Sequence, residues 1–202
     1  MEGRPRQGAR SIRMLGLFAA VAVSLSLAVA LSADARHSRP KCFGKVATIV
    51  DSDAGHAVAG TNGPDVIVAR GGADMVGGGR GNDRICSGGG RDFVIGDLGN
   101  DMINAGPKAD YVRADTDNPS PDDGNDLIKG GRGADGLQGY GGHDTVRGNQ
   151  GKDVVDGMRG NDDLFGGRKA DRLDGAEGND HCDGGPGHDS DDGRCERTTS
   201  IP

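Results

Sequence analysis

The sequence predicts an all-β protein built from many short strands that stack on one another. Aspartate recurs every nine residues through most of the chain; glycine lies two positions before it in twelve of fourteen cases, and isoleucine, leucine or valine lies two positions after it in twelve. Glycine supplies the positive φ angles of tight turns, so each unit is predicted to be a six-residue turn followed by a three-residue strand. One such strand cannot bury its single apolar residue alone, whereas a stack of strands can.

The nine-residue spacing is interrupted once. The step from Asp110 to Asp126 is sixteen residues long, so seven residues are inserted within 114–123. The phase is kept on both sides of the insertion, which a disordered glycine-rich segment has no reason to do. The phased aspartates are Asp65, Asp74, Asp83, Asp92, Asp101, Asp110, Asp126, Asp135, Asp144, Asp153, Asp162, Asp171, Asp180 and Asp189. The aliphatic residues that follow them are Ile67, Val76, Ile85, Val94, Ile103, Val112, Ile128, Leu137, Val146, Val155, Leu164 and Leu173.

Residues 1–35 have the features of a secretory signal peptide. Four arginines precede an apolar stretch at 15–31, and Ala33-Asp34-Ala35 provides a small-residue cleavage site, with cutting expected after Ala35. An uncleaved membrane anchor is the alternative, but the 17 residues of this stretch are at the short limit for a span. We therefore expect a secreted, extracellular protein with no membrane span after signal cleavage.

Charge and cysteine content limit the classes of function. Residues 1–35 contain four arginines and two acidic residues, so their removal changes the net charge from −7 to −9. An acidic chain with 3% aromatic residues is a poor candidate for binding nucleic acid and a good one for binding cations. The four cysteines, Cys42, Cys86, Cys182 and Cys195, predict two disulfides with three possible pairings. Zinc binding is the alternative, and the absence of any CxxC pair disfavours it.

The repeat resembles the RTX, or haemolysin-type, calcium-binding nonapeptide G-G-x-G-x-D-x-U-x, where U is a large aliphatic residue. The segment 130–138, GGRGADGLQ, matches it at every fixed position, and 184–189, GGPGHD, matches its turn half. The resemblance covers 60–192. It implies a parallel β-roll, that is, a right-handed β-solenoid of about fourteen nonapeptide repeats, in which successive strands alternate between two sheets. It also implies that Ca²⁺ binds between stacked turns, held by the fourteen phased aspartates and by backbone carbonyls of the glycine turns.

This fold gives the rest of the chain its expected roles. Residues 36–59 are expected to form an N-terminal linker and cap, and 193–202 a C-terminal tail. Because other pairings would have to span the stack, we expect Cys42–Cys86 to tie the cap to the third repeat and Cys182–Cys195 to close the other end. Alternate repeats should share a side, so Asp126, Asp144, Asp162 and Asp180 should form one ladder and Asp135, Asp153, Asp171 and Asp189 another.

Several positions depart from the family pattern, among them the following five. Lys108 and Lys169 replace the turn glycine two positions before the aspartate, and each brings a cation close to the predicted site. Ala69, Ser87 and Ala105 stand where the first glycine of the repeat belongs. We expect weaker binding around the two lysines.

The expected function is calcium binding outside the cell, with folding on calcium binding and a possible interaction with a matrix or a surface. The chain has no G-x-S-x-G elbow, and all the phased aspartates are accounted for as ligands, so we do not expect an enzyme. The alternative is a calcium-stabilised accessory fragment of a toxin- or hydrolase-like protein, which an exposed carboxylate cluster at the insertion would favour. The sequence identifies no protein or polysaccharide partner.

Overall fold

The structure is a computed structural model that describes residues 39–116, 120, 123–191, 194–195 and 197–199. The predicted signal peptide lies outside these residues, as does much of the insertion and of the predicted tail. The described residues belong to one compact unit, Ser38–Pro202. They include no helix of the length and hydrophobicity needed to span a membrane.

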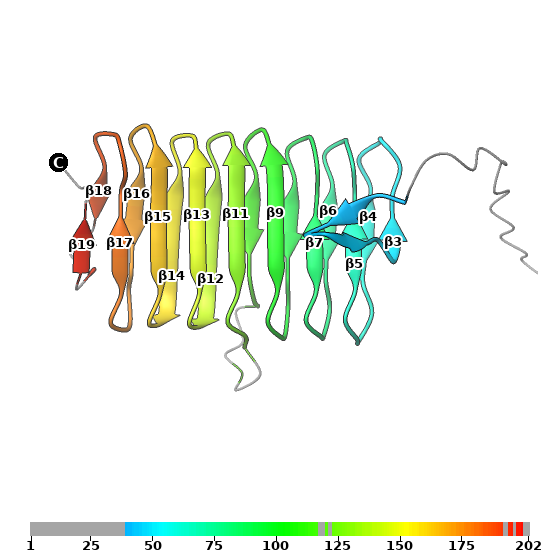
Figure 1. Ribbon diagram of the computed structural model, residues 1–202, viewed down its shortest axis with the longest axis horizontal. Helices are drawn as coiled ribbons and strands as arrows, with labels where there is room; N and C mark the ends of the chain where they lie inside the picture. Colours follow the sequence, from blue (N-terminus) through cyan, green and yellow to red (C-terminus); the bar gives the residue numbers. More distant parts are fainter. Residues whose placement is uncertain (1–38, 117–119, 121–122, 192–193, 196, 200–202) are drawn as a thin grey trace, which may run out of the picture. The chain divides into compact units, whose positions relative to one another are not determined.

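Two parallel sheets make up this unit, and the chain alternates between them (Figure 1). The eight-stranded sheet contains β4 (Ala57–Ala59), β6 (Met75–Gly77), β8 (Phe93–Ile95), β10 (Tyr111–Arg113), β12 (Gly136–Gly142), β14 (Val154–Gly160), β16 (Arg172–Asp174) and β18 (Ser190–Asp191). The nine-stranded sheet contains β3 (Ile49–Val50), β5 (Val66–Val68), β7 (Arg84–Cys86), β9 (Met102–Pro107), β11 (Leu127–Arg132), β13 (Thr145–Gln150), β15 (Asp163–Arg168), β17 (His181–Asp183) and β19 (Arg197–Thr199).

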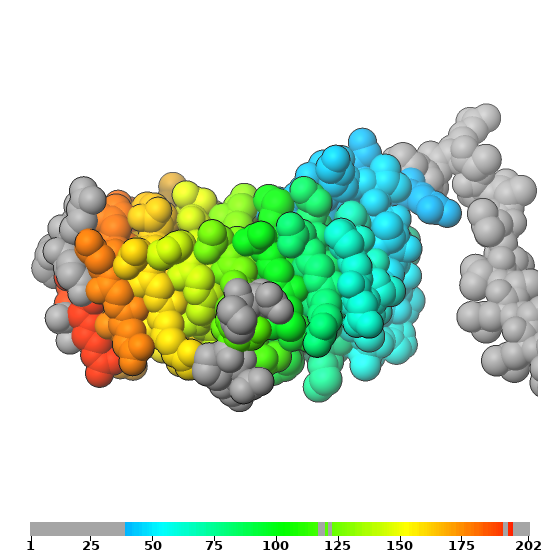
Figure 2. All heavy atoms as spheres, turned by 90° about the horizontal axis from the view of Figure 1, so that it is seen from below, coloured from blue at the N-terminus to red at the C-terminus, as the bar shows by residue number. Residues whose placement is uncertain are grey.

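The predicted all-β parallel β-roll is confirmed, with about eight turns. The fourteen repeats supply β5 to β18, two strands per turn, and β3, β4 and β19 extend the sheets at the two ends. Two of these added strands, β3 and β4, come from the segment 36–59 that the sequence assigned to a linker and cap. In the space-filling view, successive turns pack against one another in chain order (Figure 2).

The phased aliphatic residues form the core between the two sheets. Each pairs in register with its counterpart two repeats away, as Leu137 does with Val155. The insertion does not disturb this register, because Val112 pairs directly with Leu137 across it. All twelve aliphatic side chains are at most 1% exposed, and Cys182 continues their row at the C-terminal end.

Several strands are longer than the three residues expected from the repeat, whereas β5 to β8, β10, β16 and β17 have the expected three. In the second half of the chain β11 to β15 are six or seven residues long, because turn residues join the parallel pairing. Asn149, for example, pairs with Gly131 on one side and Gly167 on the other. Stacked turns of the same conformation leave their backbone N–H and C=O groups facing one another, so the hydrogen bonding of the sheet continues into the turns.

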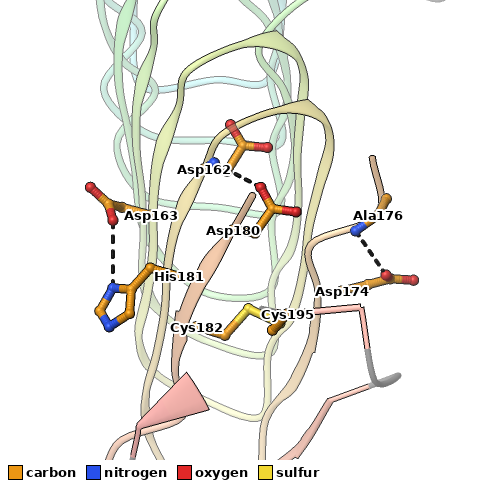
Figure 3. Close-up of a disulfide and its surroundings, with 8 residues drawn as sticks. All are labelled: Asp162, Asp163, Asp174, Ala176, Asp180, His181, Cys182 and Cys195. Atoms are coloured by element: carbon orange, nitrogen blue, oxygen red, sulfur yellow. Dashed lines mark hydrogen bonds and ion pairs between the residues drawn. A yellow bond between two sulfur atoms is a disulfide. The ribbon is translucent and has the colours of Figure 1, made fainter. Parts of the chain in front are cut away.

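Both predicted disulfides are present. Cys42–Cys86 joins β7 to a hairpin of β1 (Lys41–Cys42) and β2 (Lys45–Val46), which forms a separate antiparallel pair. Cys182–Cys195 lies at the C-terminal end of the core row (Figure 3). Each disulfide therefore ties down one end of the roll.

Candidate metal centre

The phased aspartates form two continuous ladders of hydrogen bonds. The backbone N–H of each aspartate donates to Oδ1 of the aspartate in the next stacked turn, as Asp162 does to Asp180 at 2.8 Å (Figure 3). The first ladder runs through Asp65, Asp83, Asp101, Asp126, Asp144, Asp162 and Asp180. The second runs through Asp74, Asp92, Asp110, Asp135, Asp153, Asp171 and Asp189. The predicted two-ladder arrangement is confirmed, and both ladders continue past the insertion.

In all but one of these aspartates the second carboxylate oxygen, Oδ2, has no hydrogen-bond partner among the described residues. All fourteen residues are 7% exposed or less. In thirteen of them Oδ2 is buried and makes no hydrogen bond within the described part of the chain. Asp65 differs, because its Oδ2 accepts a hydrogen bond from the backbone N–H of Thr61 at 2.7 Å. A buried carboxylate with an unpaired oxygen is strongly unfavourable unless a proton or a cation compensates it.

Burial and mutual repulsion make these carboxylates hard to ionise. Desolvation, together with neighbouring ladder aspartates, raises the pKa of Asp144 to about 10 and that of Asp101 to about 9. Desolvation raises the pKa of Asp110, Asp126 and Asp162 to about 7. To be ionised at neutral pH, these carboxylates therefore need positive charge beside them.

At nine of the thirteen unpaired oxygens, a glycine leaves free the position beside the oxygen that a Cβ atom would fill. A Cβ atom on Gly139 would lie 2.5 Å from Asp144 Oδ2 and 2.8 Å from the carbonyl oxygen of Gly157 in the next turn. A carboxylate oxygen and a backbone carbonyl thus face the same space, and calcium prefers such oxygen ligands. No group of three or more His, Cys, Asp or Glu side chains converges among the described residues, so backbone carbonyls and water would have to complete each coordination shell. With that provision, the residues present fit Ca²⁺.

The same space is filled beside the first half of the second ladder. Ala69, Ser87 and Ala105 occupy the glycine position that precedes Asp74, Asp92 and Asp110, and all three are fully buried. Ser87 Oγ also donates a hydrogen bond to the carbonyl oxygen of Ala105 at 2.8 Å, which engages that acceptor. These substitutions take away the open space that the other turns keep beside their aspartate.

Lys108 and Lys169 adopt the backbone conformation of the glycines they replace. Their φ angles are 94° and 85°, in the left-handed region, as the sequence analysis anticipated for this turn position. The Lys169 cation also acts on the second ladder, because it partly offsets the rise in the pKa of Asp153 that burial causes.

A polar ladder beside the first aspartate ladder was missed from the sequence. Residues directly before the aspartates accept, through their side chains, the backbone N–H of their counterparts in the next turn, as Asn161 Oδ1 does from Asn179 at 2.8 Å. His143 belongs to this row, and its Nδ1 accepts the N–H of Asn161 at 2.9 Å. The row also includes Asn82, Asn100 and Asn125. Asparagine recurs at this position in the sequence, so a signal for this row was present there.

Two carboxylates at the insertion were also missed. Asp115 is fully buried, and both of its oxygens lack a hydrogen bond of normal geometry within the described residues. Asp123 has one buried oxygen, Oδ1, in the same condition. Neither residue keeps the nine-residue phase, so periodicity could not have pointed to them.

A comparison with protein families agrees with this geometry. A family model described as the RTX calcium-binding nonapeptide repeat matches four segments, 58–85, 87–118, 121–155 and 156–191. No curated protein gives a significant match. The four segments cover more than half of the chain and include every phased aspartate. The chain therefore belongs to the RTX calcium-binding nonapeptide repeat family.

Proposed function

We propose that this protein is exported and binds calcium outside the cell, and that calcium binding drives its folding. The observation that carries the proposal is the row of thirteen buried Oδ2 atoms without a hydrogen-bond partner among the described residues. Without a cation these carboxylates repel one another and oppose burial. With calcium between stacked turns, the same oxygens become ligands and stabilise the turns.

The apolar core is too thin to hold the roll together by itself. Each nine-residue repeat buries one aliphatic side chain, which contributes about 1.5–3 kcal/mol. Calcium supplies the further stabilisation on this proposal.

A calcium titration of the purified chain followed by circular dichroism tests the proposal. We expect a largely disordered spectrum in chelator and β-structure in calcium, with a midpoint of about 10⁻⁴–10⁻³ M, the range of extracellular calcium modules. Magnesium at equal concentration is the control, since its preference for six close ligands suits this site less well. A chain equally folded in chelator and in calcium would refute the proposal.

Export is supported by the disulfides and by the features of residues 1–35. Disulfides such as Cys42–Cys86 and Cys182–Cys195 form and persist in oxidising compartments. Calcium at the concentrations proposed here is also found outside cells. N-terminal sequencing of protein recovered from an expressing host should give Arg36 as the first residue. Recovery of an intact Met1 from the membrane fraction would favour an anchor instead.

The proposed role is binding rather than catalysis. The phased carboxylates are buried in the turns. None of them lines the surface hollow of about 510 Å³ beside Tyr140 and Glu177, or the hollow of about 560 Å³ beside Asp123 and His143. A hydrolase-like role called for an exposed carboxylate cluster at the insertion, whereas Asp115 is fully buried.

A contact with a matrix or surface is supported by the outer face of the eight-stranded sheet. Met75, Phe93 and Tyr111 are neighbours in register on adjacent strands, and the two aromatic rings stack with centroids 5.5 Å apart. Met75 is 61% exposed and Tyr111 40% exposed, so these neighbours form a contiguous exposed apolar patch of the kind that marks interaction sites. A Met75→Ser, Tyr111→Ser variant should keep the calcium midpoint of folding but lose retention on the extracellular matrix or cell-surface fraction. Unchanged retention would count against this role.

A further inference from the structure

The turns that contain the second aspartate ladder form one edge of the roll, and this edge is basic. Each of six successive turns contributes at least one lysine or arginine, and the only acidic residues of these turns are the buried ladder aspartates. The six turns are 69–74, 87–92, 105–110, 130–135, 148–153 and 166–171. Their cations, here called the basic ridge, are Arg70, Arg91, Lys108, Arg132, Lys152, Arg168 and Lys169. The ridge is thus opposite in sign to the chain as a whole, which has a net charge of −7.

The stacking of the turns brings the cations of the basic ridge into a row. Arg132 pairs in register with Gln150, and Gln150 pairs with Arg168 in the next turn. Backbone hydrogen bonds join every pair of adjacent turns, as the N–H of Gly133 does by donating to the carbonyl oxygen of Gln150 at 2.8 Å. Because adjacent parallel strands are about 4.8 Å apart, the six turns extend about 24 Å and carry about one cation every 4 Å. Such a row is complementary to a linear polymer with a regularly repeated negative charge.

The cations of the basic ridge are available to an external partner. All seven residues are exposed, and none of them forms an ion pair with a carboxylate in the part of the chain that the structure describes. The opposite edge of the roll differs, because its Arg80 and Arg159 lie among turns that also carry carboxylates such as Asp97 and Glu177. Like charges held side by side repel one another, so a bound anion would stabilise the ridge.

Two cations of the ridge are present at a cost to their turns. Lys108 and Lys169 have φ angles of 94° and 85°, at the turn position where the other twelve repeats have glycine. Backbone strain of this kind concentrates at functional positions. A lysine beside a calcium site is unfavourable, whereas in an anion-binding row it contributes a charge that the partner requires.

A shallow hollow in the ridge favours a sugar polymer over a nucleic acid. The hollow has a volume of about 360 Å³, and the residues that line it are Gly106, Pro107, Gly131, Arg132, Asn149 and Gln150. Side-chain amides can bind sugar hydroxyl groups, and an arginine can bind a carboxylate or a sulfate. Binding of single-stranded nucleic acid relies on aromatic side chains that stack on the bases, and the six turns contain no aromatic residue.

We propose that the basic ridge binds an acidic polysaccharide, that is, a linear polymer of sugars that carry sulfate or carboxylate groups. The polymer runs along the stack of turns, with its anionic groups on the cations of successive turns and one sugar in the hollow beside Arg132 and Gln150. The inference rests on the proposed function, because it names the class of matrix or surface partner and requires the folded roll. Calcium acts in the same direction, since it neutralises the aspartates of the turns that carry the cations.

The test measures binding of dextran sulfate to the full chain by isothermal titration calorimetry, at a calcium concentration that saturates folding. Uncharged dextran, which has the same sugar backbone, is the control ligand. We expect dextran sulfate to bind and dextran not to bind, and the affinity should fall as sodium chloride is added, because salt screens exposed charges. Dextran sulfate should also lower the calcium midpoint of folding, since a ligand that binds only the folded chain stabilises it.

Two double variants locate the site. Arg132→Gln, Arg168→Gln should bind dextran sulfate about tenfold more weakly, the effect of losing two exposed ion pairs. Glutamine already occupies the same turn position at Gln150, so this variant should fold. Arg80→Gln, Arg159→Gln is the matched control, because it makes the same change at exposed residues in the same turn position on the opposite edge. The control should bind like the wild-type chain, and circular dichroism checks that both variants fold.

The outcomes separate this inference from the proposed function. Equal affinities of the two double variants, or no preference for dextran sulfate over dextran, would overturn the inference and leave calcium-driven folding intact. Tighter binding of oligodeoxythymidylate than of dextran sulfate would overturn a polysaccharide as the partner. If Arg132→Gln, Arg168→Gln does not fold, Arg91→Gln, Lys152→Gln decides by the same comparison. A chain equally folded in chelator would refute the proposed function, yet its ridge should then bind dextran sulfate in chelator as well.

Discussion

At the scale of single residues, the turns depend on positions where the backbone takes a positive φ. One lies four residues before the aspartate and tolerates other residues, such as Tyr140 and Asn149. The other lies two residues before it and is glycine in all but two turns. For a residue with a Cβ, a backbone conformation in the left-handed region costs about 1–2 kcal/mol of folding free energy. Lys108 and Lys169 therefore strain their turns.

Lys169→Gly should lower the calcium concentration at the midpoint of folding. The change relieves a φ of 85° and removes a cation beside the second ladder. Lys152→Gly is the matched control, because Lys152 is also exposed and precedes a ladder aspartate but does not adopt a positive φ. Lys152→Gly should raise the midpoint slightly. Glycine at this position only increases the conformational entropy of the unfolded chain, which destabilises the fold by about 0.5–1 kcal/mol. Circular dichroism titrations of both variants measure the difference, and shifts in the same direction would contradict the assignment.

Replacing one ladder aspartate by asparagine should raise the calcium midpoint more in the C-terminal half of the roll than in the N-terminal half. Asp144→Asn keeps an acceptor for the N–H of Asp126 but removes a charged oxygen that faces an open glycine space, so we expect a clear rise in the calcium midpoint. Asp92→Asn makes the same chemical change where Ser87 fills that space, and we expect a much smaller rise. Isothermal titration calorimetry of both variants checks this expectation. Equal effects would mean that the glycine space is not where calcium binds.

At the scale of elements, each of the strands β5 to β16 contributes one aliphatic residue to the core row, and the two neighbours of that residue lie on the opposite face of the strand. Val155 on β14 is 0% exposed, whereas Val154 beside it is 48% exposed. The strand is too short to be stable alone, and its inward residue packs only against strands before and after it. A defect in one strand should therefore weaken the turns on both sides of it.

Val155→Ala should destabilise the calcium-bound roll by about 1.5–3 kcal/mol, the value of burying one such side chain. Val154→Ala removes the same atoms from the outer face and should change stability by less than about 0.5 kcal/mol. Urea unfolding at fixed calcium gives both values. Comparable losses in the two variants would contradict this one-sided burial, and a larger loss for Val154→Ala would place the strand in the opposite register.

At the scale of the whole unit, two rows of buried carboxylates oppose folding, and any cation that binds them favours it. Protons can take this role as well as calcium. The pKa values of ladder aspartates in the folded chain are raised from about 3.8 by burial, to about 6 at Asp83 and about 10 at Asp144. The metal-free folded chain therefore binds protons more tightly than the unfolded chain does.

The stability of the metal-free roll should consequently rise as the pH falls. The gain starts as the pH drops below the folded-state pKa values, about 10 to 6, and is complete below the unfolded value of about 3.8. In calcium the dependence reverses, because protons compete for the ligand oxygens, and the calcium midpoint should increase between pH 8 and pH 5. Circular dichroism in chelator and in calcium across this range measures both trends. A calcium midpoint independent of pH would show that the ladder carboxylates are not the ligands.

Much of this architecture is encoded in the period of the sequence. A nine-residue repeat with one aliphatic residue admits one way of burying that residue, by stacking, so the all-β roll, its core row and the two ladders could be predicted from spacing. The pairing of the four cysteines followed from the stack, because Cys42 and Cys86 share one end and Cys182 and Cys195 the other.

Other features depend on contacts between turns that are not adjacent in sequence. The extension of strand pairing into the turns and the role of Ala69, Ser87 and Ala105 in filling the glycine space emerge only when a turn lies on its neighbour, 18 residues away. The burial of Asp115 has the same origin, because the longer turn breaks the period and leaves the direction of its side chain to local packing. The period of the sequence predicts the structure of the repeated positions. The structure at positions that break the period depends on contacts with the turns stacked on either side of them.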